Sequence, residues 1–221
     1  MPWQLPEGEF VLRLFPLPNV VFFPGTRLPL HVFEPRYRQL VSDAIASQEP
    51  IGMVLLREGW EERYYGNPPI HAVGTLGIIE QVVQLEDGRY NLLLSGRARY
   101  RIAAEETPVL YRAARVVAHP ETAPSPMDAW AQREWLVELA RRYLEILPGQ
   151  VEVPELATAS LESLVNALIM SLNLDMQVKQ ELLETDAIVA RCEKAGAILE
   201  ERLAAAQFLA PFRRDQDPEK N

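Results

Sequence analysis

The segment LFPLPNVVFFPG at residues 14–25, continued by LPLHVFEPRY at residues 28–37, decides the fold of the first half of this chain. Apolar side chains take every second position in and just before these runs: Phe10, Leu12, Leu14, Leu28, Leu30 and Val32. A period of two predicts two β-strands. The prolines between the strands lack the backbone N–H that a strand ladder needs, so they predict an irregular crossing there.

A helix is predicted to begin directly after the second run. Pro35 suits the first helical position, where its missing N–H costs no hydrogen bond. Apolar residues then follow at helical spacing: Tyr37, Leu40, Val41, Ala44 and Ile45. Such a stripe predicts an amphipathic helix that buries one face.

The remaining residues up to 118 indicate further strands around a polar, aromatic loop at residues 57–69. Strand patterns occur at residues 51–56, 71–85, 90–94 and 111–118. The Asp87-Gly88 pair predicts the turn of a hairpin. Residues 1–118 therefore predict a small, curled, mostly antiparallel barrel with one embedded helix.

The pattern changes at residues 119–126, where three prolines in eight residues predict a stiff linker. After the linker, apolar residues recur at helical spacing, which predicts four helices within residues 127–212. Residues 213–221 form a polar tail. The predicted fold class is α+β, with a β-rich barrel over residues 1–118 followed by a C-terminal four-helix bundle.

Composition narrows the classes of function. The chain has 221 residues, and 22 Lys and Arg against 31 Asp and Glu give a net charge of −9. An acidic chain repels the phosphate backbone, which disfavours non-specific binding of nucleic acid. The single cysteine, Cys192, excludes an intrachain disulfide. The sequence has neither an export signal at its start nor an apolar run of about 18 residues, so we expect a cytoplasmic protein with no membrane segment.

Three patches of the sequence resemble the Lon N-terminal domain, the polypeptide-binding front end of the ATP-dependent Lon proteases. They are residues 14–37, then VGTLGIIE (73–80) with DGR (87–89) and LSGRARYRI (94–102), and finally KQELLE (179–184). The resemblance implies a PUA-like pseudobarrel followed by a helical bundle. It also implies binding of unfolded or extended polypeptide segments. Because neither motor nor peptidase sequence follows before residue 221, we expect a stand-alone, non-catalytic binding protein that serves a protein partner such as a separate protease.

No arrangement of residues predicts catalysis. The sequence contains neither a Gly-x-x-x-x-Gly-Lys phosphate loop nor a Gly-x-Ser-x-Gly elbow. Lys179 and Lys194 are expected to face solvent rather than to activate a serine. The histidines are scattered, so we expect His31 to pack or to form a hydrogen bond, and Cys192 is expected in the core of the last helix. We therefore predict no enzyme, no cofactor and no metal site.

Two segments are candidates for contact with a polypeptide. At the strand–helix corner the candidates are Phe33, Glu34, Arg36, Tyr37 and Arg38. In the aromatic loop they are Trp60, Tyr64 and Tyr65. We expect the loop aromatics to be exposed, because Glu and Arg crowd the loop. Aromatic side chains beside charges would supply both apolar contact and orientation. In a simpler interpretation, Phe33 and Tyr37 only anchor the helix on the barrel.

Three other modes of interaction remain open from the sequence. Arg97, Arg99 and Arg101 alternate along a predicted strand, so they would share one face and could hold an RNA backbone. We favour a solvated face whose arginines pair with the surplus carboxylates. Strand addition to an open barrel edge and self-association as a structural protein are the other two modes.

Overall fold

The computed structural model describes residues 5–63, 66–106, 110–146 and 159–214. Contacts divide the chain into two units, the first made of residues 1–121 and 174–184 and the second of residues 122–173 and 185–221. The division after Glu121 falls inside the predicted linker. The predicted domain boundaries themselves stay a prediction.

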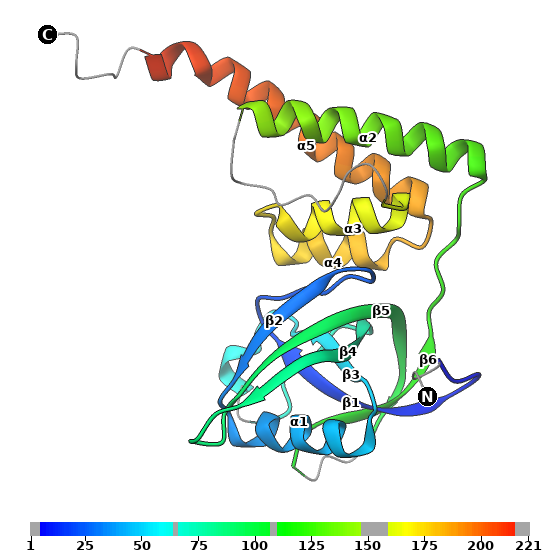
Figure 1. Cartoon of the computed structure of the whole chain (residues 1–221), viewed down its shortest axis with the longest axis vertical. Helices are drawn as coiled ribbons and strands as arrows, with labels where there is room; N and C mark the ends of the chain where they lie inside the picture. Colours follow the sequence, from blue (N-terminus) through cyan, green and yellow to red (C-terminus); the bar gives the residue numbers. More distant parts are fainter. Residues whose placement is uncertain (1–4, 64–65, 107–109, 147–158, 215–221) are drawn as a thin grey trace, which may run out of the picture. The chain divides into compact units, whose positions relative to one another are not determined.

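The first unit contains a mixed sheet that closes into a barrel (Figure 1). Its strands are β1 (Phe10–Leu17), β2 (Arg27–Val32), β3 (Ile51–Leu55), β4 (Val73–Gln84), β5 (Tyr90–Glu105) and β6 (Ala113–Ala118). The order is β2-β5-β4-β3-β1-β6, and a further pairing of β5 with β6 joins the two sides of the sheet. Among the described pairings between these six strands, only that of β1 with β3 is parallel. The predicted α+β class is confirmed.

The barrel interior follows directly from the period of two in the sequence. Leu12 and Leu14 of β1 point inward and are at most 2% exposed, whereas Val11 between them is 62% exposed. Tyr100 of β5 is fully buried, and its hydroxyl donates to the Met53 carbonyl at 3.1 Å. That bond satisfies the polar end of a side chain whose ring fills the core.

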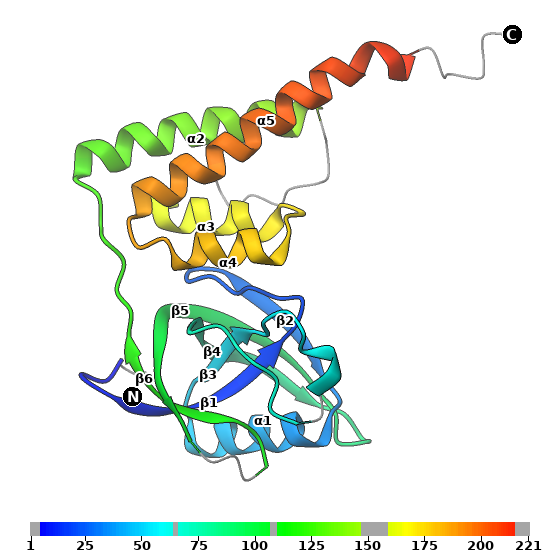
Figure 2. The same cartoon turned by 180° about the vertical axis from the view of Figure 1, so that it is seen from behind.

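Helix α1 (Pro35–Ser47) lies along one side of the barrel in both views (Figure 1 and Figure 2). Pro35 occupies its first turn, and the helix ends at Gln48 in a left-handed conformation with φ of 56°. Four members of the predicted stripe are buried: Tyr37, Leu40, Val41 and Ala44. Ile45 departs from the prediction, because it is 39% exposed.

Helix α4 (Met176–Glu184) belongs to the first unit, where it packs on β4. Asp175 precedes it and accepts a hydrogen bond from the Gln177 N–H at 2.7 Å, as an N-terminal cap does. The Gln180 side chain donates to the Val73 carbonyl at 3.0 Å. The expectation that Lys179 faces solvent is wrong: it lies on the packed side of α4 and is 8% exposed.

Three helices pack on one another in the second unit: α2 (Pro126–Ile146), α3 (Leu161–Ser171) and α5 (Ile188–Arg214). The Ser160 hydroxyl caps α3 by accepting the Ser163 N–H at 3.1 Å. Arg191 of α5 is fully buried and donates to the Asn166 side-chain oxygen of α3 at 2.9 Å. Cys192 is also fully buried, so its predicted place in the core is confirmed.

Candidate functional site

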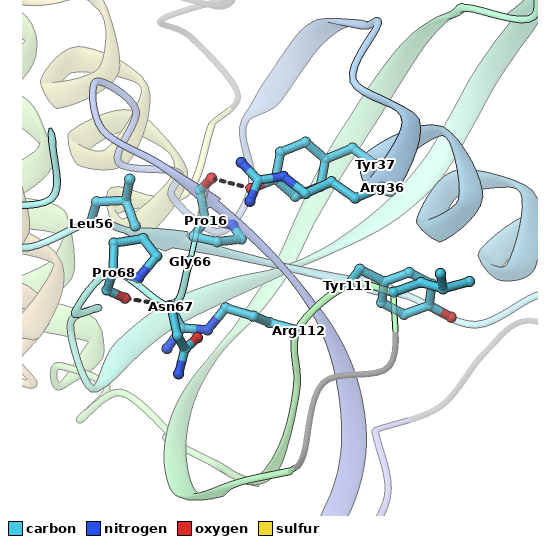
Figure 3. Close-up of a pocket in the computed structure, with 10 residues that line it drawn as sticks. Pro16, Arg36, Tyr37, Leu56, Gly66, Asn67, Pro68, Tyr111 and Arg112 are labelled. Carbon is cyan, nitrogen blue, oxygen red and sulfur yellow. Dashed lines mark hydrogen bonds between the residues drawn. The ribbon is translucent and has the colours of Figure 1, made fainter. Parts of the chain in front are cut away.

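A cavity of about 130 Å³ opens at the predicted strand–helix corner (Figure 3). Segments far apart in the sequence line it: Pro16, Arg36, Tyr37, Leu56, Gly66, Asn67, Pro68, Leu110, Tyr111 and Arg112. We call this the corner cavity. Small-molecule sites usually enclose roughly 300–1,000 Å³, so the corner cavity has room for a side chain rather than for a cofactor.

Tyr37 forms the aromatic wall of the corner cavity. Its ring packs on the Phe15 ring with centroids 4.2 Å apart, and its hydroxyl donates to the Pro16 carbonyl at 3.4 Å (Figure 3). The guanidinium of Arg36 lies over the same ring, 4.5 Å from its centroid. The tyrosine is therefore fixed between the barrel core and a cation, and the predicted anchoring role of Tyr37 agrees with its 4% exposure.

Both arginines of the corner cavity are held by carboxylates. Arg36 pairs with Glu34 at 3.0 Å, and both side chains are largely shielded from solvent. Arg112 donates to the Glu105 carboxylate at 2.5 Å. It also donates to the Pro68 carbonyl at 2.5 Å (Figure 3). The cavity thus keeps two guanidinium groups at fixed positions, with most of their charge balanced by carboxylates. Such donors can orient the polar backbone of a bound ligand, but they do not select a strongly acidic one.

Tyr111 connects the cavity wall to α1. Its hydroxyl donates to the Asp43 carboxylate at 2.6 Å and accepts from Arg13 Nε at 3.1 Å. The hydrogen bond from Tyr111 lowers the pKa of Asp43, and burial raises the pKa of Tyr111. Arg13 also pairs with Glu49. These bonds fix the segment before β6 against α1, and so fix that side of the cavity.

The other predicted corner residues lie outside the cavity. Phe33 is 61% exposed, so its predicted role as an anchor of the helix is wrong: β2 ends before it, and its ring stacks loosely on His31 instead. His31 forms a hydrogen bond with Asn91, which confirms its expected hydrogen-bonding role. Arg38 packs against Gly88 at the tip of the β4–β5 hairpin.

Trp60 lines a second cavity, of about 230 Å³, together with Leu55, Leu56 and Met176. Its expected exposure is wrong, because Trp60 is half-buried. The rim carries the carboxylates of Glu58, Glu61 and Asp175, and His71 lies in the wall. Burial lowers the pKa of His71. Tyr64 and Tyr65 lie outside the described residues.

The predicted basic face of β5 does not form. Arg97 and Arg101 are exposed, but Arg99 between them is only 2% exposed. Arg99 is covered because α4 and the segment after β6 pack over it, and it donates to the carbonyls of Leu183 and Pro120. The register shift at Gly96–Ala98 also leaves Arg97 as an extra residue in a β-bulge. An RNA strand would thus meet two separated arginines instead of a continuous strip.

Residues that sequence reasoning missed include Leu110, Asn67 and Pro68. Leu110 is 65% exposed at the cavity, and Pro68 supplies the carbonyl that receives Arg112. No local periodicity marks them, since each stands in a loop and joins the site only through the barrel closure.

Two features are absent from the part of the chain that the structure describes. Among these residues, His, Cys, Asp and Glu nowhere gather in a group of three or more that could hold a metal ion. None of the helices in the described segments combines the length and the apolar character required to cross a membrane.

The chain is similar to known proteins over most of its length. The chain is 33% identical over 188 residues to Lon protease 2 of Myxococcus xanthus, covering 82% of this chain and 22% of that protein. It is 32% identical over 190 residues to the Lon protease of Anaeromyxobacter dehalogenans, with the same two coverages of 82% and 22%. The chain therefore spans about a fifth of the length of these curated relatives.

Solved structures share the fold. A crystal structure of a Lon N-terminal domain protein from Xanthomonas campestris matches with a TM-score of 0.62 and 26% identity, covering 85% of this chain and 98% of that chain. The N-terminal domain of a Mycobacterium avium complex Lon protease matches with a TM-score of 0.64 over 86% of this chain and 98% of that chain; at 18% identity it shows the fold alone. A family model described as the ATP-dependent protease La (LON) substrate-binding domain matches residues 11–201. The chain belongs to this family of Lon substrate-binding domains.

Proposed function

We propose that this chain binds unfolded or extended polypeptide segments through its β-rich unit and does not itself cleave them. The family model is described as a substrate-binding domain. The part of the Lon proteases that the chain matches is about a fifth of their length. The partner would be a polypeptide client, which the chain holds for a separate protease or for another complex. A cytoplasmic setting fits a chain with one cysteine, because that chain makes no intrachain disulfide.

The corner cavity is the observation that carries this proposal. The half-buried Tyr111 supplies aromatic surface, Leu110 stands 65% exposed beside it, and the buried Tyr37 forms the wall behind them. The arginines are fixed by carboxylates. A client side chain would enter the apolar part, while the fixed N–H donors would meet backbone carbonyls. Aromatic and arginine side chains around a small pocket are typical of the centres of protein interfaces.

The test measures binding of fluorescently labelled, reduced and carboxymethylated lactalbumin, which stays unfolded, by anisotropy. In the variant Leu110→Ser we expect affinity to fall about tenfold, which corresponds to about 1.4 kcal/mol. Val11→Ser is the matched control, because Val11 is 62% exposed and does not line the cavity.

The control variant should bind as the wild type does. Equal affinity of Leu110→Ser and wild type would show that the corner cavity takes no part in polypeptide binding. Absence of binding to any of the proteins would contradict polypeptide binding altogether, and a concentration-dependent dimer in sizing chromatography would then favour self-association.

A further inference from the structure

Strand β4 is paired on both sides only in its first part. Its residues 75–77 pair with β3, whereas residues 78–84 have β5 on one side and no strand on the other within the described chain. An open sheet edge presents backbone N–H and C=O groups that accept another strand. We call residues 78–84 the β4 edge.

The β4 edge lacks the usual protection over its outer part. Proteins blunt exposed edges with charges, prolines or bulges. A bulge is present at Glu80, where the register with β5 shifts between Ile79 and Gln81. Beyond it, the run from Gln81 to Gln84 contains neither charge nor proline, and Val83 is 60% exposed.

The hairpin register shows which backbone groups face outward. Leu85 N–H donates to the Arg89 carbonyl at 2.8 Å, so these two residues form a hydrogen-bonded pair across the hairpin. Antiparallel pairs alternate between hydrogen-bonded and non-hydrogen-bonded. Val83, opposite Asn91, therefore bonds to β5, while Val82 and Gln84 direct their N–H and C=O groups to the open side.

A groove of about 460 Å³ lies between this edge and α1. Its lining is uncharged: Ser42, Ile45 and Ala46 from α1, with Val82, Gln84 and Tyr90 from the hairpin. Both views show the hairpin running out beside one end of α1 (Figure 1 and Figure 2). The Arg38 side chain lies next to Gly88 there, so the hairpin tip is adjacent to the helix.

We propose that this groove binds an extended polypeptide segment as an added strand along the β4 edge. The outward backbone groups lie on alternate residues, Val82 and Gln84, which matches the repeat of a second strand. The uncharged lining selects an occupant whose groove-facing side chain is apolar or neutral, such as valine or threonine, seated between Ile45 and Tyr90. The inference shares with the proposed function its class of ligand, but it uses a different surface.

The probe is a fluorescent peptide of alternating threonine and valine, in three forms. The first is unmodified. The second carries N-methyl groups on its odd-numbered backbone amides, and the third carries them on its even-numbered backbone amides. An added strand donates to the sheet edge from every second amide, so only one of the two sets is needed for binding. We expect one methylated form to bind within about twofold of the unmodified peptide and the other to bind at least about tenfold more weakly.

Variants of the protein test the same edge. Val82→Pro removes an outward N–H without removing a bond to β5, and we expect it to weaken binding of the unmodified peptide about tenfold. Val83→Ser is the matched control on the opposite face of the strand and should bind as the wild type does. Amide hydrogen exchange provides a readout that does not depend on a variant: Val82 and Gln84 should exchange fast in the free protein and become protected with peptide, while Val83 is protected in both.

Several results would overturn the inference. Equal binding of the two methylated peptides would exclude a backbone ladder, and unchanged exchange at Val82 would exclude this edge. If the protein does not bind the peptide but forms a dimer that Val82→Pro dissociates, the edge would be assigned to a second copy of the chain. The two proposals fail separately, since Leu110→Ser should keep peptide binding at the β4 edge while it binds the unfolded lactalbumin about tenfold more weakly.

Discussion

Arg99 Nη1 donates a hydrogen bond to the main-chain carbonyl of Leu183 at 2.8 Å and so ties the middle of β5 to the last turn of α4. The same guanidinium donates to the Pro120 carbonyl at 3.0 Å and lies 3.6 Å from the Glu121 carboxylate. A cation that the strand pattern would place in solvent thus joins three segments of the first unit.

Replacing this cation is expected to destabilise the protein strongly. Arg99→Met leaves the Glu121 carboxylate, whose side chain is 11% exposed, without its guanidinium neighbour. Breaking a buried pair in this way costs about 3–5 kcal/mol. Urea unfolding followed by circular dichroism measures the loss.

Arg97→Met is the control for Arg99, because Arg97 is exposed on the same strand, and its effect should stay within about 0.5 kcal/mol. The double variant Arg99→Met/Glu121→Gln should recover part of the stability by removing the buried negative charge that faced Arg99. If Arg99→Met unfolds at the same urea concentration as the wild type, the cation does not hold α4 in place.

Gly74 permits the close approach of β4 to β3 and to Tyr100. A Cβ at this position would lie 2.6 Å from the Tyr100 hydroxyl and would clash with the Met53 carbonyl. Gly74→Ala is therefore expected to cost about 1–3 kcal/mol, measured by thermal and urea unfolding. In Gly66→Ala the nearest atom is 3.4 Å away, so this exposed control should be nearly neutral; similar losses in both variants would contradict the packing argument.

His71 gives the first unit a pH-dependent stability. Burial lowers the pKa of His71 below its ordinary value; the nearby Glu184 opposes the shift and Arg57 adds to it. The unfolded state therefore binds a proton more readily than the folded state, so stability is complete above about pH 6.5 and falls as the pH drops towards the lowered pKa. His71→Gln should flatten this part of the curve, measured by urea unfolding across the range.

The control for this effect is His31→Gln, which changes an exposed histidine on β2. It should leave the dependence on pH intact. A curve for His71→Gln that runs parallel to the wild-type curve would show that other groups cause the loss of stability.

Cys192 is expected to be unreactive in the native protein. Burial raises the pKa of its thiol to about 12, with a smaller contribution from Glu193. At about pH 8 the thiolate fraction is then about a thousandfold below that of a free cysteine, and the side chain is also inaccessible. An aromatic disulfide reagent should react only as urea unfolds the second unit; complete labelling without denaturant would contradict the buried placement.

Short-range patterns were sufficient to predict much of the fold. The alternation at Leu12 and Leu14, the Asp87-Gly88 turn and the Pro35 helix start all correspond to observed elements. These features succeed because strand and helix periods, turns and caps depend on residues within a few positions of one another.

The site was only partly predictable. Arg36 and Tyr37 line the corner cavity, but Leu110 and Arg112 reach it from about seventy residues away along the chain, brought there by barrel closure. Phe33 is an aromatic residue beside a helix start, which predicts an anchor, and yet it is exposed. Whether an aromatic ring is buried depends on which element packs over it.

By itself, the sequence determined the strands, the helices, the α+β class and the family, since each is encoded in local period or in motifs. Only the tertiary structure decided that Lys179 and Arg99 are covered and that the β4 edge stays open. The physical reason is common to all three. The period of a strand or helix determines the face on which a side chain lies, but long-range packing determines whether anything lies against that face.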